Sequence, residues 1–83
     1  MTLANLKPGD SAIVSGFKDS DVSLKLMEMG CLPGEVVKVI GVAPLGDPIS
    51  IKISGYILSL RKKEAGFVRI AAVPSLTALN PSA

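Results

Sequence analysis

The segment Pro48-Ile49-Ser50-Ile51-Lys52-Ile53-Ser54 decides the fold class. Three isoleucines alternate with polar residues, and a period of two places them on one face of a β-strand. Similar short segments rich in Val and Ile recur along the chain between Gly and Pro turn signals. We expect strands at Ser11–Phe17, Glu35–Val42, Pro48–Ser54, Tyr56–Leu60 and Phe67–Ala71. The sequence therefore predicts a mainly β domain, either a sandwich or a small barrel of about five strands.

One segment breaks this rhythm and indicates a short α-helix near residues 20–29. Val22, Leu26 and Met29 recur at the spacing of one helix face. Asp19 or Ser20 can cap the start, because a short side-chain oxygen accepts the free N–H groups of the first turn. Gly30 supplies the left-handed residue that ends a helix. A second helical turn is expected at Lys62–Ala65.

Length and composition bound the class of protein. The chain has 83 residues, of which 48% are hydrophobic and 19% are charged, so it supports one folded domain. We expect that domain to span residues 1–72. Residues 73–83 form an uncharged tail, which would be disordered or packed on a neighbouring chain through Leu76 and Leu79.

Several kinds of site are excluded or disfavoured by residue type. The chain has no His and only one Cys, so imidazole sites, thiolate cages and internal disulfides are excluded. The Ser-His-Asp and Cys-His arrangements of nucleophilic catalysis are excluded for the same reason. No segment has the 20 or so apolar residues of a membrane span, and no secretory signal is present. We therefore expect a cytoplasmic protein that is not an enzyme and needs no cofactor.

Nucleic-acid binding has weak support. Arg61-Lys62-Lys63 is a short basic run, but the net charge is only +2. Base stacking needs aromatic platforms, and the aromatic residues are only Phe17, Tyr56 and Phe67. The lack of Trp also counts against a groove for Pro-rich peptides. The basic run is interpreted as a solvated turn.

Two segments are candidate surfaces for a protein partner. In Pro44-Leu45-Gly46-Asp47-Pro48 the two prolines stiffen the loop, and Leu45 either projects from the tip or folds back onto the barrel. Around the helix end, Met27, Met29, Cys31 and Leu32 form a second candidate, although residues of these types more often belong to a core. For Cys31 alone, a small apolar filler is the favoured role, since a helix C-terminus disfavours a thiolate.

Joined in order, these motifs resemble the ferrous iron transport protein A (FeoA) family. The resemblance covers about Leu3 to Ile70. It is carried by the four segments Glu28-Met29-Gly30-Cys31-Leu32-Pro33-Gly34, Ala43-Pro44-Leu45-Gly46-Asp47-Pro48-Ile49, Gly55-Tyr56 and Leu60-Arg61-Lys62-Lys63-Glu64-Ala65. Many relatives have Arg at the position of Lys25. A lysine at this position keeps a point contact but loses the bidentate contact that an arginine can make.

The resemblance implies a small SH3-like β-barrel and a role in bacterial ferrous iron uptake. The implied partner is the membrane permease FeoB, which carries a cytosolic GTPase domain, so contact with the membrane would be indirect. Ferrous iron sites favour imidazole, and this chain has none, so we expect that it does not carry iron itself. We assign docking to Met29, Cys31, Leu32, Pro44, Leu45, Gly46, Asp47 and Pro48 as a hypothesis. Self-association is permitted by exposed strand edges. The alternative function is an SH3-like regulatory domain that binds RNA, the ribosome or another regulatory protein.

Overall fold

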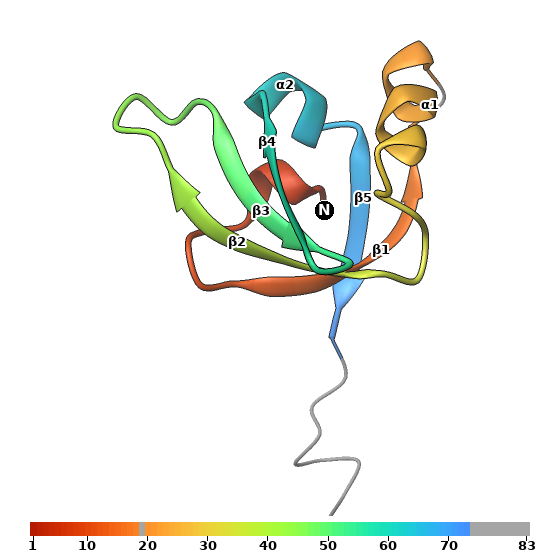
Figure 1. Cartoon of the computed structure of the whole chain (residues 1–83), viewed down its shortest axis with the longest axis horizontal. Coiled ribbons are helices and arrows are strands. Elements are labelled where there is room, and N and C mark those ends of the chain that lie inside the picture. Colours follow the sequence, from red (N-terminus) through yellow and green to blue (C-terminus); the bar gives the residue numbers. More distant parts are fainter. Residues whose placement is uncertain (19, 74–83) are drawn as a thin grey trace, which may run out of the picture.

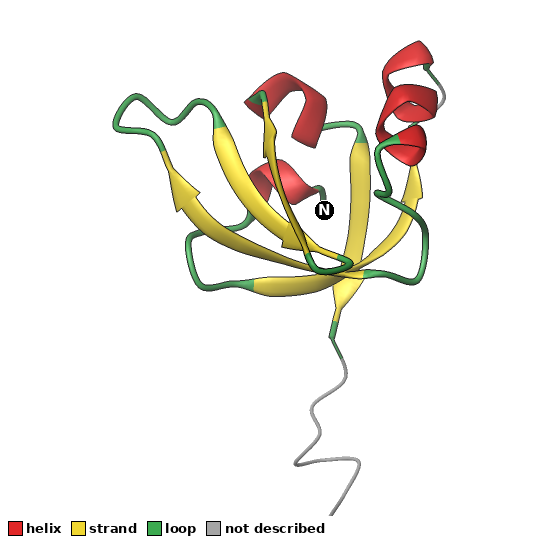
Figure 2. Ribbon diagram, viewed as in Figure 1, coloured by secondary structure: helices red, strands yellow, loops and turns green. Residues whose placement is uncertain are grey.

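The computed structural model describes residues 1–18 and 20–73 and has the expected mainly β architecture (Figures 1 and 2). The expected capping role of Asp19 and the expected behaviour of the tail from residue 74 lie outside the described residues. The elements follow in the order η1 (Leu3–Asn5), β1 (Ser11–Phe17), α1 (Asp21–Glu28), β2 (Val36–Val42), β3 (Ile49–Ile53), β4 (Tyr56–Leu60), α2 (Lys62–Ala65) and β5 (Val68–Ala72).

All strands belong to one antiparallel sheet with the order β4-β3-β2-β1-β5. The register shifts between Val14 and Gly16 in β1 and between Val39 and Gly41 in β2. Such bulges increase the local twist and bend a strand. The sheet accordingly curls round on itself (Figure 2). The first strand of the chain lies beside the last, and this arrangement gives a small barrel rather than a sandwich.

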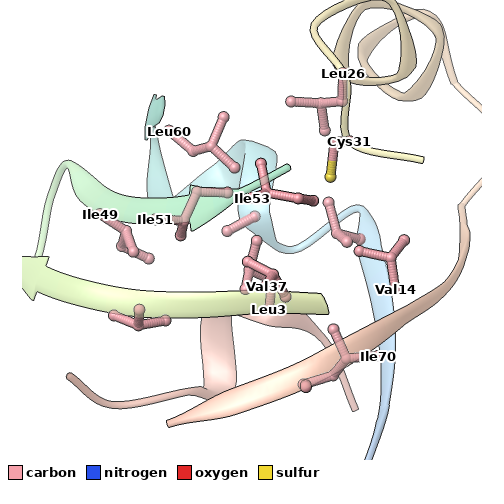
Figure 3. Close-up of a cluster of buried hydrophobic side chains, with 14 residues drawn as sticks. Leu3, Val14, Leu26, Cys31, Val37, Ile49, Ile51, Ile53, Leu60 and Ile70 are labelled. Atoms are coloured by element: carbon pink, nitrogen blue, oxygen red, sulfur yellow. The ribbon is translucent and has the colours of Figure 1, made fainter. Parts of the chain in front are cut away.

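The core is built from the alternation that the sequence shows most clearly. Ile49, Ile51 and Ile53 of β3 all point inward and are buried, as the period of two predicts (Figure 3). Val37 and Val39 on β2 and Val14 on β1 meet them from the neighbouring strands. Burying each such side chain contributes about 1.5–3 kcal/mol. This cluster is therefore the main source of stability.

Helix α1 begins and ends as its sequence predicts. The Ser20 hydroxyl accepts a 3.2 Å hydrogen bond from the backbone N–H of Ser23 and caps the first turn. At the other end, Gly30 has φ +99°, and the N–H of Cys31 donates to the carbonyl of Leu26 at 3.0 Å. This pattern is a Schellman motif, in which the residue after the glycine packs against the last turn. Leu26 and Cys31 are both fully buried and lie side by side in the core (Figure 3).

One buried element was not predicted. The 3-10 turn η1 places Leu3 in the barrel interior, where it is fully buried. Three residues carry no periodicity, so the sequence offers no signal for it. The chain start is further fixed because Thr2 bridges Arg69 and the N–H of Ile70 donates to the carbonyl of Met1 at 3.2 Å. The N-terminal residues therefore cover part of the outer edge of β5.

Candidate functional site

The loop between β2 and β3 presents the most exposed large apolar side chain of the described residues. The N–H of Gly46 donates to the carbonyl of Ala43 at 2.7 Å, and the N–H of Ala43 donates to the carbonyl of Pro48 at 3.1 Å. The Asp47–Pro48 peptide bond is cis. Leu45 stands at the tip of this bonded loop with 97% of its surface exposed. Of the two alternatives for Leu45, the structure shows the projecting one.

The base of this loop is tied to α2. A carboxylate oxygen of Asp47 accepts a 3.0 Å hydrogen bond from the backbone N–H of Lys62 at the start of the helix. In the same turn, the Glu64 carboxylate accepts the N–H of Arg61 at 2.8 Å. Free N–H groups at a helix start are satisfied by acceptors of this kind. Both carboxylates are thereby oriented by the backbone.

A polar depression of about 430 Å³ opens beside this contact. It is lined by Lys25, Asp47, Pro48, Ser59, Arg61 and Glu64. Two cations, Lys25 and Arg61, and two carboxylates, Asp47 and Glu64, therefore line one space. Lys25 and Ser59 were not singled out as site residues from the sequence, because no local pattern shows that α1 faces the base of a loop 20 or so residues away. Arg61 was noted in the basic run and, together with Glu64, in the family resemblance, but neither was assigned to a site.

The second candidate surface, at the end of α1, is only partly available. Met29 is 38% exposed and Leu32 is 45% exposed, so both can contact a partner. Cys31 is fully buried, and burial raises the pKa of its thiol to about 11. The assignment of Cys31 to the contact surface is therefore wrong, whereas the favoured role of a small apolar filler agrees with its burial, because the Schellman motif turns its side chain into the core.

The structure does not bring the two candidate surfaces together. The β2–β3 loop lies at one side of the barrel, and the connection that leaves α1 lies at the other, with α2 between them (Figure 1). Met29 and Leu32 are therefore separated from Leu45. A wider depression of about 950 Å³ lies between the end of β1 and α1, and its lining includes Met27 but neither Met29 nor Leu32.

The described residues contain neither a cluster of metal-ligating side chains nor a helix that could span a membrane. No group of three or more His, Cys, Asp or Glu side chains within residues 1–18 and 20–73 is placed to hold a metal ion. In the same part of the chain, no helix has the length and apolar character needed to span a membrane.

Comparison with known proteins agrees with this architecture. The family model described as "FeoA domain" matches residues 1–72. An Fe(2+) transport protein A/Fe(2+) transporter FeoB fusion protein of Porphyromonas gingivalis is 31% identical over 83 residues, which are 99% of this chain. The chain spans only about a tenth (10%) of the length of that relative.

Two solved structures give the same result for the fold. The FeoA-like protein of Clostridium acetobutylicum superposes with a TM-score of 0.84 at 34% identity, over 90% of this chain and 88% of the other. The zinc complex of Stenotrophomonas maltophilia FeoA superposes with a TM-score of 0.77 at 29% identity, over 86% and 89%. The latter protein is described as a prokaryotic SH3 domain protein possibly acting as a ferrous iron transport activating factor.

The curled five-stranded sheet, its short helix and these superpositions define a small SH3-like β-barrel domain. The FeoA family model also matches this domain, over residues 1–72. This chain belongs to the FeoA family of ferrous iron transport proteins.

Proposed function

We propose that this chain is a non-enzymatic, cytoplasmic accessory protein that binds the cytosolic GTPase part of a FeoB-type permease and modulates its assembly or activity. The observation that carries the proposal is the P. gingivalis relative, in which the two transport proteins are one chain. Fusion holds two partners at a high effective concentration, which benefits proteins that bind each other.

The Leu45 loop suits such a contact. Leu45 is 97% exposed, yet the hydrogen bonds at Ala43 and the Asp47–Lys62 contact hold the loop that carries it. An apolar side chain on a preorganised loop loses little conformational entropy when it binds. Pro44, Gly46, Asp47 and Pro48 act mainly by holding this loop, and Leu45 is the proposed anchor.

Met29 and Leu32 form a second proposed contact. Their separation from Leu45 means that a compact partner domain would cover one of the two surfaces (Figure 1). A partner that contacts both surfaces would have to extend around the barrel. Substitutions at the two surfaces can therefore be tested independently.

The experiment is a binding assay against the full-length permease with and without GTP. Leu45→Asp should weaken binding at least about tenfold, which corresponds to 1.4 kcal/mol. Leu24→Asp is the matched control, because Leu24 is also exposed (57%) but lies on α1. Leu32→Asp tests the second surface.

The outcomes separate the parts of the proposal. Unchanged affinity of a folded Leu45→Asp variant would remove the loop from the interface. A lack of binding by the unmodified chain in both nucleotide states would overturn the accessory function itself.

A further inference from the structure

Within residues 1–18 and 20–73, strand β4 is an edge of the sheet with a neighbour on one side. It pairs only with β3, at one end of the strand order (Figure 1). The opposite edge, β5, is partly covered by the bridge between Thr2 and Arg69 and by the bond from Ile70 to Met1. A row of unpaired N–H and C=O groups on an edge strand is a template for another strand.

The hairpin turn shows which groups of β4 point outward. Ser54 and Gly55 have φ +50° and +80°, and they join Ile53 directly to Tyr56. In such a two-residue hairpin the flanking pair exchanges both hydrogen bonds, and bonded pairs then alternate along the ladder. Leu58 and Leu60 therefore bond to β3, and the backbone groups of Ile57 and Ser59 face away from it.

These outward groups have no other partner. Among residues 1–18 and 20–73, the hydrogen bonds outside the sheet include none to the backbone of Ile57 or Ser59. Both residues are exposed, with Ile57 at 68%. Two donors and two acceptors at alternating positions are thus open to solvent.

The surroundings of this edge carry positive charge. On the outer face, Ile57 stands opposite Lys52, and Lys52 stands opposite Lys38, with all three exposed. Like charges directly opposite each other on neighbouring strands are destabilising. Exposed Arg61 follows the end of β4. The carboxylates that line the depression beside Ser59 are already hydrogen-bonded to the backbone of α2.

We propose that the β4 edge binds an extended, acidic segment of a partner protein, which adds to the sheet as a further strand. Main-chain bonds to Ile57 and Ser59 would supply affinity, and alternate side chains would supply specificity. Neighbouring strands are about 4.8 Å apart, so an acidic side chain beside Ile57 reaches the Lys52 ammonium across one strand. This surface does not include Leu45, although Ser59 shares a depression with Asp47 and Pro48 at the base of that loop, and its partner need not be the permease.

Charge distinguishes this partner from a second copy of the chain. Two β4 strands paired edge to edge would bring two sets of Lys52 and Arg61 toward each other. An acidic segment instead relieves the repulsion between Lys38 and Lys52. Its binding should weaken as salt is added, because exposed charges are screened.

The test uses the full chain and the peptide acetyl-Val-Glu-Ile-Glu-Val-Glu-amide, a strand of about six residues. Amide hydrogen exchange at Ile57 and Ser59 should be fast in the free protein and at least about tenfold slower with the peptide, since a sheet bond must open before exchange. The same peptide with Lys in place of Glu, and a version N-methylated at alternate residues, should give no protection.

Two protein variants locate the contact. Ser59→Pro removes one outward N–H but no bond to β3, a position where an edge strand tolerates proline. It should lower peptide affinity at least about tenfold, and Ser59→Ala, which keeps the N–H, should not. Lys52→Glu should weaken binding of the Glu peptide and strengthen binding of the Lys peptide. This charge swap leaves the backbone of β4 unchanged.

Each outcome decides the proposal. Absence of protection at Ile57 and Ser59 by the Glu peptide would overturn it, as would equal binding of the Glu and Lys peptides. Protection that rises with protein concentration in the absence of peptide would identify a second copy as the occupant. None of these readouts depends on Leu45 or on the permease, so the two proposals can fail separately.

Discussion

A carboxylate oxygen of Asp47 lies 3.0 Å from the backbone nitrogen of Lys62, 15 positions later in the chain. The bond connects the base of the β2–β3 loop to the first turn of α2. It therefore links the two segments that carry most of the family resemblance, Ala43–Ile49 and Leu60–Ala65. The position of Leu45 depends on a helix that follows two strands later.

Asp47→Ala should lower the free energy of unfolding by about 0.5–2 kcal/mol, the usual cost of losing an acceptor at a helix start. Asp47→Asn keeps an acceptor oxygen and should lose less. Urea denaturation of the three proteins measures the difference. Equal midpoints for Asp47→Ala and the unmodified chain would mean that the contact adds no stability.

Truncation of Leu45 should change the free energy of unfolding far less than truncation of Ile51. Leu45→Ser should change stability by no more than about 0.5 kcal/mol, because the side chain is almost fully exposed. Ile51→Ala should cost about 2–5 kcal/mol, because it removes a fully buried side chain from the centre of the core. Thermal unfolding followed by circular dichroism gives both values. A large loss at Leu45 would mean that it folds back onto the barrel.

Gly30 and Gly41 form a matched pair for backbone strain. A Cβ at either position would meet no atom within 4 Å, but only Gly30 has a positive φ, +99°. Gly30→Ala should therefore cost about 1–2 kcal/mol through backbone strain alone. Gly41→Ala should be close to neutral or slightly stabilising. Denaturant midpoints compare the two, and similar losses in both variants would contradict the strain argument.

Burial of Cys31 predicts a loss of stability at alkaline pH. The thiol pKa is raised from 9.0 to about 11 by burial, so the folded state favours the protonated form. The resulting stabilisation is complete below pH 9 and is lost as the pH rises from about 9 to about 11. The measurement is the difference between the unmodified chain and Cys31→Ala in the slope of unfolding free energy against pH. Parallel slopes would contradict the raised pKa.

The same burial predicts low reactivity, because the thiolate is the reactive form of cysteine. Native protein at neutral pH should resist alkylation by iodoacetamide, and unfolded protein in denaturant should react completely. Rapid labelling of the native protein would show that the Cys31 site opens readily.

The strands were predictable because their signals are local. Ile49, Ile51 and Ile53 alternate within a single strand, and Ser20 and Gly30 mark the ends of α1 by their own backbone preferences. The observed elements differ from the expected ranges by a residue or so at their ends, where strands and helices have the weakest local signal.

The features that the sequence did not show depend on contacts between distant segments. Leu3 is buried because the barrel interior is completed from the chain start. For Cys31 the sequence favoured the buried filler role, and only its assignment to the contact surface disagrees with the structure. Tyr56 shares the side of β4 that Leu60 occupies, yet it is 69% exposed, whereas Ile53 opposite it on β3 is buried. The depression gathers residues from three elements and a loop, so no single motif specifies it.

The pairing of β1 with both β2 and β5 has a consequence for synthesis of the protein. The first strand to leave the ribosome cannot be paired on both sides until Val68–Ala72 has also emerged. Contacts between distant segments form slowly because a long loop must close first. The nascent chain should therefore stay sensitive to protease until Val68–Ala72 has emerged, and it should then become resistant in one step.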